Sequence, residues 1–181
     1  MAPNGNIFSK LSIKNKNMPK ILNIITHPNS ILRKVSSELS KPEILTPEIQ
    51  RLLLDMELTM LDKDGAGLAA PQIGKNIRLI VISHDKKTLF FINPKITKKS
   101  WARKIEEEGC LSVINKKGEI IYGPVSRHKR ISCVYLDEKG NKKTLAAEDM
   151  LARVLQHEID HLNGILFIDY LDKLPTKPKK A

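Results

Sequence analysis

The chain has 181 residues, of which 41% are hydrophobic and 4% aromatic, and it carries a formal net charge of +11. This length suits a single domain with its own core, and no apolar run approaches the roughly 20 residues that cross a bilayer, which argues against a membrane protein. The basic charge is compatible with association with the ribosome, but so few aromatic residues argue against a base-stacking platform. We therefore expect no specific recognition of nucleic acid.

Residues 1–19 are predicted to form a flexible basic leader before a folded domain at residues 20–172. The first 20 residues contain four lysines and no acidic residue, and they lack the continuous apolar segment of a secretory signal. A cytoplasmic location is therefore expected; the alternative is an organelle of bacterial origin if residues 1–17 are the remnant of a targeting segment. Residues 173–181 are predicted to be a lysine-rich tail.

The predicted elements begin with a proline turn and a short amphipathic segment at residues 26–39. The clearest helix follows, because Thr46 can cap it, Pro47 suits its first turn and Gly65 lies just past its end. Its apolar face consists of Ile49, Leu52, Leu53, Met56 and Met60. Residues 65–74 are rich in small side chains and are predicted to form a loop.

Strands are predicted in the middle of the chain, where apolar residues alternate or run continuously. They are expected at residues 77–83, 88–96 and 119–125, and in a hairpin at residues 131–147 with its turn at 138–141. A second helix is predicted from about Glu148 to Asn163, with Gly164 as its stop. Helices at the ends and strands between them indicate an α+β fold with a mostly antiparallel sheet.

The second predicted helix contains the pattern His-Glu-x-x-His at residues 157–161. His157 and His161 are four residues apart, so they lie on one face of a helix and can bind the same metal ion. Glu158 can reach a water on that ion. Burying three ionisable groups in an otherwise apolar helix is costly, which favours a metal site over a polar helix face.

A catalytic metal site needs a third ligand. No histidine follows His161 and no glutamate follows Glu158, while Asp169 and Asp172 lie in an apolar segment close behind the helix. The best donor is therefore Cys110, because a thiolate with two imidazoles binds zinc or iron(II) and leaves a fourth position for water. Gly109 allows a tight backbone in the loop predicted around this cysteine.

The remaining cysteine and histidines are predicted to have other roles. Cys133 lies in an apolar alternating run and is expected to be a small core residue. Both cysteines are expected to be reduced, since two are too few for a disulfide framework. His27, His84 and His128 lie in polar or turn contexts and are expected at the surface.

Three separated stretches resemble, in order and spacing, the signature motifs of the peptide deformylase family: GAGLAAPQIG at 65–74, EGCLS at 108–112 and QHEIDH at 156–161. The resemblance covers about residues 20–172. With the predicted elements, it implies a sheet packed around a central metal-binding helix, with an N-terminal helix. It also implies a metal-dependent hydrolase that removes the formyl group from the N-terminal formylmethionine of newly made polypeptides.

The resemblance assigns roles in this reaction. The implied metal ligands are Cys110, His157 and His161, with iron(II) expected in the cell and nickel, cobalt or zinc able to substitute. Glu158 is the implied general base. The side-chain amide of Gln72 and the backbone N–H of Leu111 are the implied donors to the oxyanion.

The resemblance also implies substrate contacts. Gly67 leaves room for a peptide backbone that pairs as an added strand. The implied methionine pocket is lined by Leu111, Met150 and Val154. Glu108 and Arg127 are expected to form an ion pair that stiffens the cysteine loop.

The chain departs from the family pattern around Ile114, at His27-Pro28 and in its short tail, where Pro175 and Pro178 would interrupt the long C-terminal helix of some members. Ile114 stands where many members have proline, and residues 115–123 are predicted to form a longer loop at the rim of the substrate cleft. His27 precedes Pro28 where the family has aspartate. Two other functions stay open on the sequence alone: a short metallopeptidase with a downstream carboxylate ligand, and a basic ribosome- or RNA-binding module without catalysis.

Overall fold

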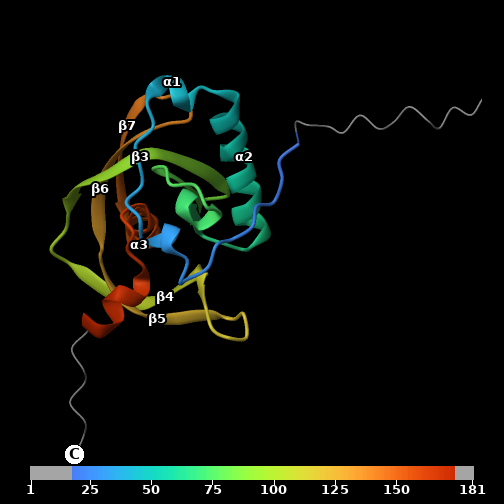
Figure 1. Ribbon diagram of the computed structural model, residues 1–181. Helices are drawn as coiled ribbons and strands as arrows, with labels where there is room; N and C mark the ends of the chain where they lie inside the picture. Colours follow the sequence, from blue (N-terminus) through green and yellow to red (C-terminus); the bar gives the residue numbers. More distant parts are fainter. Residues whose placement is uncertain (1–17, 174–181) are drawn as a thin grey trace, which may run out of the picture.

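The computed structural model describes residues 18–173, and Figure 1 shows helix α3 in the middle of the molecule with strands on both sides of it. Most of the predicted leader, residues 1–17, and all but the first residue of the predicted tail lie outside the described residues. The observed architecture is α+β, with antiparallel strands and a central helix, as the sequence predicted.

The two longer helices of the described part agree with the sequence predictions, and the short helix α1 was not predicted. They are α1 Lys41–Ile44, α2 Pro47–Asp62 and α3 Asp149–Leu162, with short 3-10 helices at Ser30–Arg33, Ala70–Ile73 and Phe167–Lys173. Thr46 caps α2, because its hydroxyl oxygen accepts a hydrogen bond from the backbone N–H of Ile49. Within residues 18–173, no helix has the length and apolar character to cross a membrane.

The strands form two antiparallel sheets. The larger sheet has the order β1-β2-β3-β6-β7, and the smaller one pairs β4 with β5. The strands are β1 Gly67–Ala69, β2 Leu79–His84, β3 Lys87–Lys99, β4 Arg103–Ile114, β5 Ile120–His128, β6 Arg130–Leu136 and β7 Lys142–Glu148. The predicted hairpin is confirmed, since β6 and β7 pair from Arg130↔Glu148 to Leu136↔Lys142.

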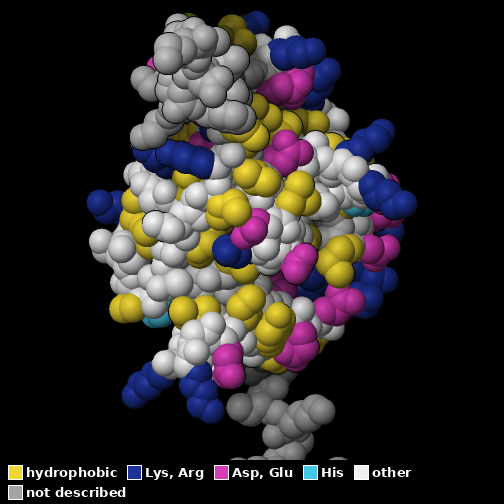
Figure 2. Space-filling model, turned by 90° about the vertical axis from the view of Figure 1, so that its right-hand side faces the viewer, with side chains coloured by type: hydrophobic (Ala, Val, Ile, Leu, Met, Phe, Trp, Pro, Cys, Tyr) yellow, Lys and Arg dark blue, Asp and Glu magenta, His cyan; other side chains and the backbone are white. Residues whose placement is uncertain are grey.

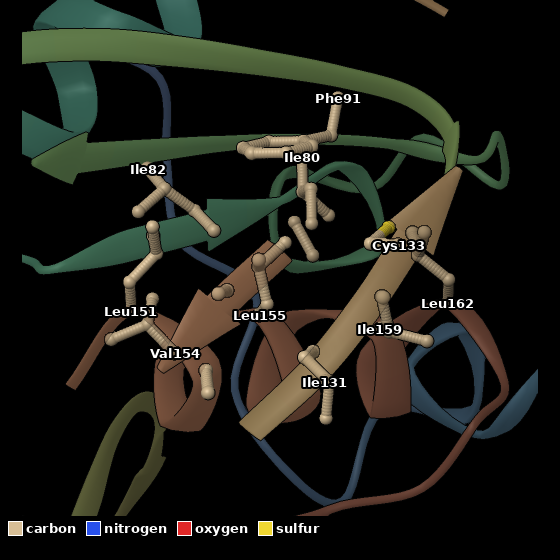
Figure 3. Packing of buried hydrophobic residues seen from close by; sticks show 13 residues of the cluster. Ile80, Ile82, Phe91, Ile131, Cys133, Leu151, Val154, Leu155, Ile159 and Leu162 are labelled. Carbon is tan, nitrogen blue, oxygen red and sulfur yellow. The ribbon is translucent and has the colours of Figure 1, made fainter. Parts of the chain in front are cut away.

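Strand β2 is covered on both faces, which explains its unbroken apolar run. Leu79 and Val81 are buried in a hydrophobic cluster that also contains Met56 and Met60 of α2. Ile80 and Ile82 point the other way, into a cluster with the apolar face of α3 (Figure 3). Successive side chains of a strand alternate between faces, so β2 joins the two parts of the core.

Helix α3 is positioned by the second of these clusters. Leu155 and Ile159 pack against the large sheet, in the arrangement that Figure 3 shows from close by. The opposite side of the helix is therefore turned towards β4 and β5, which Figure 1 places below it. Any polar group on that side of α3 is held rigidly between the two sheets.

Two predictions about the middle of the chain were wrong, and a third, the loop at residues 65–74, was incomplete. Cys110 lies within strand β4 and not in a loop, because the charged residues before it pair with β5, as in Glu108↔Gly123. The long loop predicted at residues 115–123 is a tight turn, closed by the Asn115 N–H bond to the carbonyl of Glu119, before β5 begins at Ile120. The predicted loop at residues 65–74 also contains β1 and a 3-10 helix.

Candidate metal centre

Helix α3 holds the two histidines of the His-Glu-x-x-His pattern side by side. The ring centroids of His157 and His161 are 5.0 Å apart and the rings meet edge to face. His161 is buried, and His157 is only partly exposed. This is the geometry that a spacing of four residues predicts for one face of a helix.

Strand β4 brings Cys110 to these histidines. The Cys110 Sγ lies 3.2 Å from the His161 Nε2, and the ligand atoms of Cys110, His157 and His161 all lie within 4.8 Å of one another. The pairing with β5 is irregular between Gly109 and Ile114, so the strand bends where it carries the cysteine. Gly109 leaves room for the Tyr122 ring on β5, which a Cβ atom at this position would overlap.

Glu108 orients the first histidine. The His157 Nδ1–H donates to the Glu108 carboxylate at 3.0 Å, which leaves Nε2 as the atom that can bind a metal. Burial raises the pKa of Glu108, but hydrogen bonds from His157 and Arg127 outweigh it and lower the pKa to about 2. The carboxylate is therefore ionised throughout the range in which a metal site would work.

Two buried arginines hold Glu108 in place. Arg127 donates to both of its carboxylate oxygens at 3.0 Å, as the family resemblance implied, and also pairs with Asp160 of α3. Arg153 donates to the Glu108 Oε1 at 2.6 Å and to Glu106 at 2.8 Å. The role of Arg153 was missed from the sequence, although its place four residues before His157 on the same helix was a usable signal.

Glu158 is buried beside the metal-binding atoms. Its side chain is 4% exposed, and its Oε2 has no hydrogen-bond partner among the described residues. Burial raises the pKa of Glu158 to about 7. The absence of a side chain at Gly67 makes room for this carboxylate, because a Cβ atom there would lie 2.6 Å from the Glu158 Oε1.

Gln72 is held next to the cysteine. Its Oε1 accepts a hydrogen bond from the Ala69 N–H at 2.7 Å, so its amide N–H group is turned towards the Cys110 Sγ, 3.5 Å away. The Gln72 side chain is 2% exposed. Pro71 and Gln72 both belong to the 3-10 helix Ala70–Ile73, which fixes the backbone at this position.

A cavity of about 440 Å³ opens onto these groups. Its walls include Gly67, Leu111, Met150, Val154 and Tyr122, together with Gln72, Cys110, His157 and Glu158. Met150 is 63% exposed and Val154 is 9% exposed, so the cavity runs from an exposed rim, where Met150 lies with charged residues such as Asp64 and Glu107, to a buried polar end. Figure 2, seen from the side of α2, shows hydrophobic side chains gathered over this face with acidic ones among them.

The other candidate ligands lie elsewhere. His27 is exposed, His84 is half-exposed and His128 is half-buried against the Ser100 carbonyl, so none of them belongs to the metal-binding group. Asp169 pairs with Arg33 on the surface. Within residues 18–173, the structure thus assembles one group of possible ligands, and its third member comes from upstream of the helix.

The residues at this site fit a divalent metal ion. A thiolate and two imidazoles form a donor set for zinc or iron(II), and three protein ligands leave a position for water. The Glu108 hydrogen bond fixes the tautomer of His157, as an outer carboxylate does for a metal-bound histidine. The Glu158 Oε2, which has no hydrogen-bond partner among the described residues, belongs to a side chain that lines the same cavity.

Comparisons with known proteins agree with this site. The model of the polypeptide deformylase family matches residues 21–177. A peptide deformylase of Rhizobium meliloti is 44% identical over 156 residues, which are 83% of this chain and 85% of that protein.

Solved structures of the same family superpose on the fold. A class I type b peptide deformylase from Acinetobacter baumannii, with Met-Ala-Ser bound, has a TM-score of 0.78 at 30% identity and covers 84% of this chain and 99% of its own. A peptide deformylase from Synechococcus elongatus, in complex with actinonin, has a TM-score of 0.76 at 38% identity and covers 83% of this chain and 78% of its own. Sequence, fold and metal-binding residues therefore place this chain in the polypeptide deformylase family of enzymes.

Proposed function

We propose that the chain hydrolyses the amide bond between the formyl group and the amino-terminal methionine of newly made polypeptides. The products are formate and a free amino terminus. This proposal rests on one observation. Cys110, His157 and His161 form a cluster of possible metal ligands, and Glu158 lines the same cavity as Cys110 and His157. The Acinetobacter baumannii relative with Met-Ala-Ser bound supports it, because that peptide begins with methionine.

The metal that we propose for this site is iron(II) in the cell, with nickel, cobalt or zinc able to substitute. Cys110, His157 and His161 are the proposed ligands, and residues 20–172 the proposed catalytic domain. A divalent metal in this position would lower the pKa of its water to about 7 and so supply a nucleophile at neutral pH.

Glu158 is the proposed general base. It takes a proton from the attacking water and passes it to the nitrogen of the leaving amine, so the amide bond breaks as formate forms. Burial favours this role, since the raised pKa of Glu158 lies near neutral pH, where a group can both accept and return a proton.

Two donors are proposed to stabilise the oxyanion that forms on the formyl oxygen. One is the Gln72 amide, whose N–H group is already turned towards the Cys110 Sγ. The other is the backbone N–H of Leu111, the residue after the cysteine. Removing one such donor typically lowers the rate by about 100- to 1,000-fold.

The substrate is proposed to enter along strand β1. This strand is at the edge of the large sheet and Gly67 lines the cavity, so a peptide backbone can pair with it as an added strand. The methionine side chain would then contact Leu111, Met150 and Val154, which line the same cavity.

The decisive experiment measures formate released from formyl-Met-Ala-Ser by metal-loaded protein, together with bound metal. Glu158→Gln should keep the metal and lose activity by about 100- to 10,000-fold, because a base that is not a ligand has been removed. Formate release by Glu158→Gln at the normal rate would contradict the assignment of the base. No formate from any metal-loaded form of the unaltered chain would contradict the proposed function.

A further inference from the structure

Two turns lie next to one another on the side of the molecule away from α2 (Figure 1). The turn between β3 and β4 is joined to the turn between β5 and β6 by backbone hydrogen bonds. The Ser100 N–H donates to the Arg130 carbonyl at 2.8 Å, and the Lys129 N–H donates to the Ala102 carbonyl at 2.9 Å. The backbones of the two turns are thus held next to one another.

Trp101 lies at the tip of the first turn with its whole side chain in water. Its relative exposure is 101%, the highest of the exposed large hydrophobic residues in the described part. Tryptophan usually buries most of its surface, so a fully exposed indole on a hydrogen-bonded turn is available to a partner.

The surface around Trp101 is strongly basic. Lys98, Lys99, Lys129 and Arg130 are exposed, and none of them forms an ion pair with a described residue. Glu148 lies opposite Arg130 in the strand pairing and is an acid close to this group. Four unpaired cations therefore remain available to an anionic partner.

Some of these cations line a hollow that reaches Ser100, the residue before Trp101. It has a volume of about 440 Å³, and its lining includes Lys98, Lys99, Ser100, Arg130 and Glu148. It is separate from the cavity of the metal centre, since the two share no lining residue. Three of the four cations thus line one concave surface, whose residue Ser100 directly precedes Trp101 in the chain.

We propose that this Trp101 surface, made of Lys98, Lys99, Trp101, Lys129 and Arg130, binds single-stranded RNA without sequence preference. The cations neutralise backbone phosphates, and an unpaired base stacks on the indole. An anionic lipid surface is the weaker match, because membrane binding scales with buried apolar area and this surface offers one aromatic side chain. The Trp101 surface would be a second binding surface on an enzyme whose proposed chemistry lies elsewhere.

The chain provides its own probe, because Trp101 is the one tryptophan of the sequence. We would add a single-stranded oligouridine of about 12 nucleotides and follow tryptophan fluorescence. This length lies within the range that one small binding domain covers on a single strand. The expected result is a saturable change whose log–log salt slope is about −3, since four phosphate contacts each contribute about −0.7. An unchanged emission at saturating RNA would overturn the proposal.

Matched variants separate this surface from the other lysines of the chain. Lys98→Gln with Lys99→Gln should reduce the salt slope by about 1.4. The control pair is Lys142→Gln with Lys143→Gln, two exposed lysines at the far end of β7, which should leave the slope unchanged. Equal effects of both pairs would show general attraction to a basic protein and would refute a defined surface.

A third variant tests stacking directly. Trp101→Ala, measured with labelled RNA, should bind about tenfold or more weakly, while formate release should stay unchanged because the residue lies outside the catalytic cavity. In the last experiment, vesicles of phosphatidylcholine with phosphatidylglycerol replace the RNA, and tryptophan fluorescence is measured again. A fluorescence change with these vesicles and none with RNA would replace the RNA proposal with a membrane surface.

Discussion

Replacing Gly67 by alanine should displace the carboxylate of Glu158. The new Cβ atom would lie 2.6 Å from Oε1, 2.8 Å from Cγ and 2.9 Å from Cδ of that side chain. Carbon and oxygen atoms normally pack at about 3.5 Å, so the carboxylate must move by about 1 Å. Glu158 is buried, and a displacement of this size in an active site can lower the rate by about 100-fold.

The assay is steady-state formate release, with bound metal measured on the same samples. Gly65→Ala is the matched control, because its Cβ would meet its nearest neighbours at 3.3–3.4 Å and needs only a small adjustment. A fall in kcat with metal retained in Gly67→Ala is the expected result. If KM rises instead and kcat is unchanged, Gly67 serves the substrate backbone and not Glu158. If Gly67→Ala matches Gly65→Ala, the steric argument is wrong.

Three further predictions concern the metal and its surroundings. Cys110→Ala should lose the metal and Cys133→Ala should keep it, as elemental analysis of both purified proteins would show; equal retention would exclude Cys110 as a ligand. Arg153→Met should lower the free energy of unfolding, measured with urea, by about 3 kcal/mol, because it leaves the buried Glu108 carboxylate partly unpaired. The control is Lys143→Met at an exposed lysine, which should change that free energy by less than about 1 kcal/mol. Air should inactivate the iron form and spare the nickel form in formate release, since iron(II) next to a thiolate is open to oxidation; equal lifetimes would argue against iron at a thiolate site.

The helices and their metal-binding pattern could be predicted from local sequence. Thr46 and Pro47 mark the start of α2, and the spacing of His157 and His161 places both on one face of α3 wherever that helix lies. The hairpin of β6 and β7 is equally local, because an apolar alternating run and a glycine turn are enough to indicate it. These features depend on residues within one or two helical turns or one strand pair, so the sequence by itself determined them.

The surroundings of the site were decided by tertiary structure. The charged run before Cys110 looked like a loop, but Glu108 is buried because Arg127 from β5 and Arg153 from α3 both reach it. The same holds for Gly67, whose missing side chain makes room for Glu158, a residue far along the chain. Burial of a charge depends on partners that the fold brings from distant segments, and no local pattern contains that information.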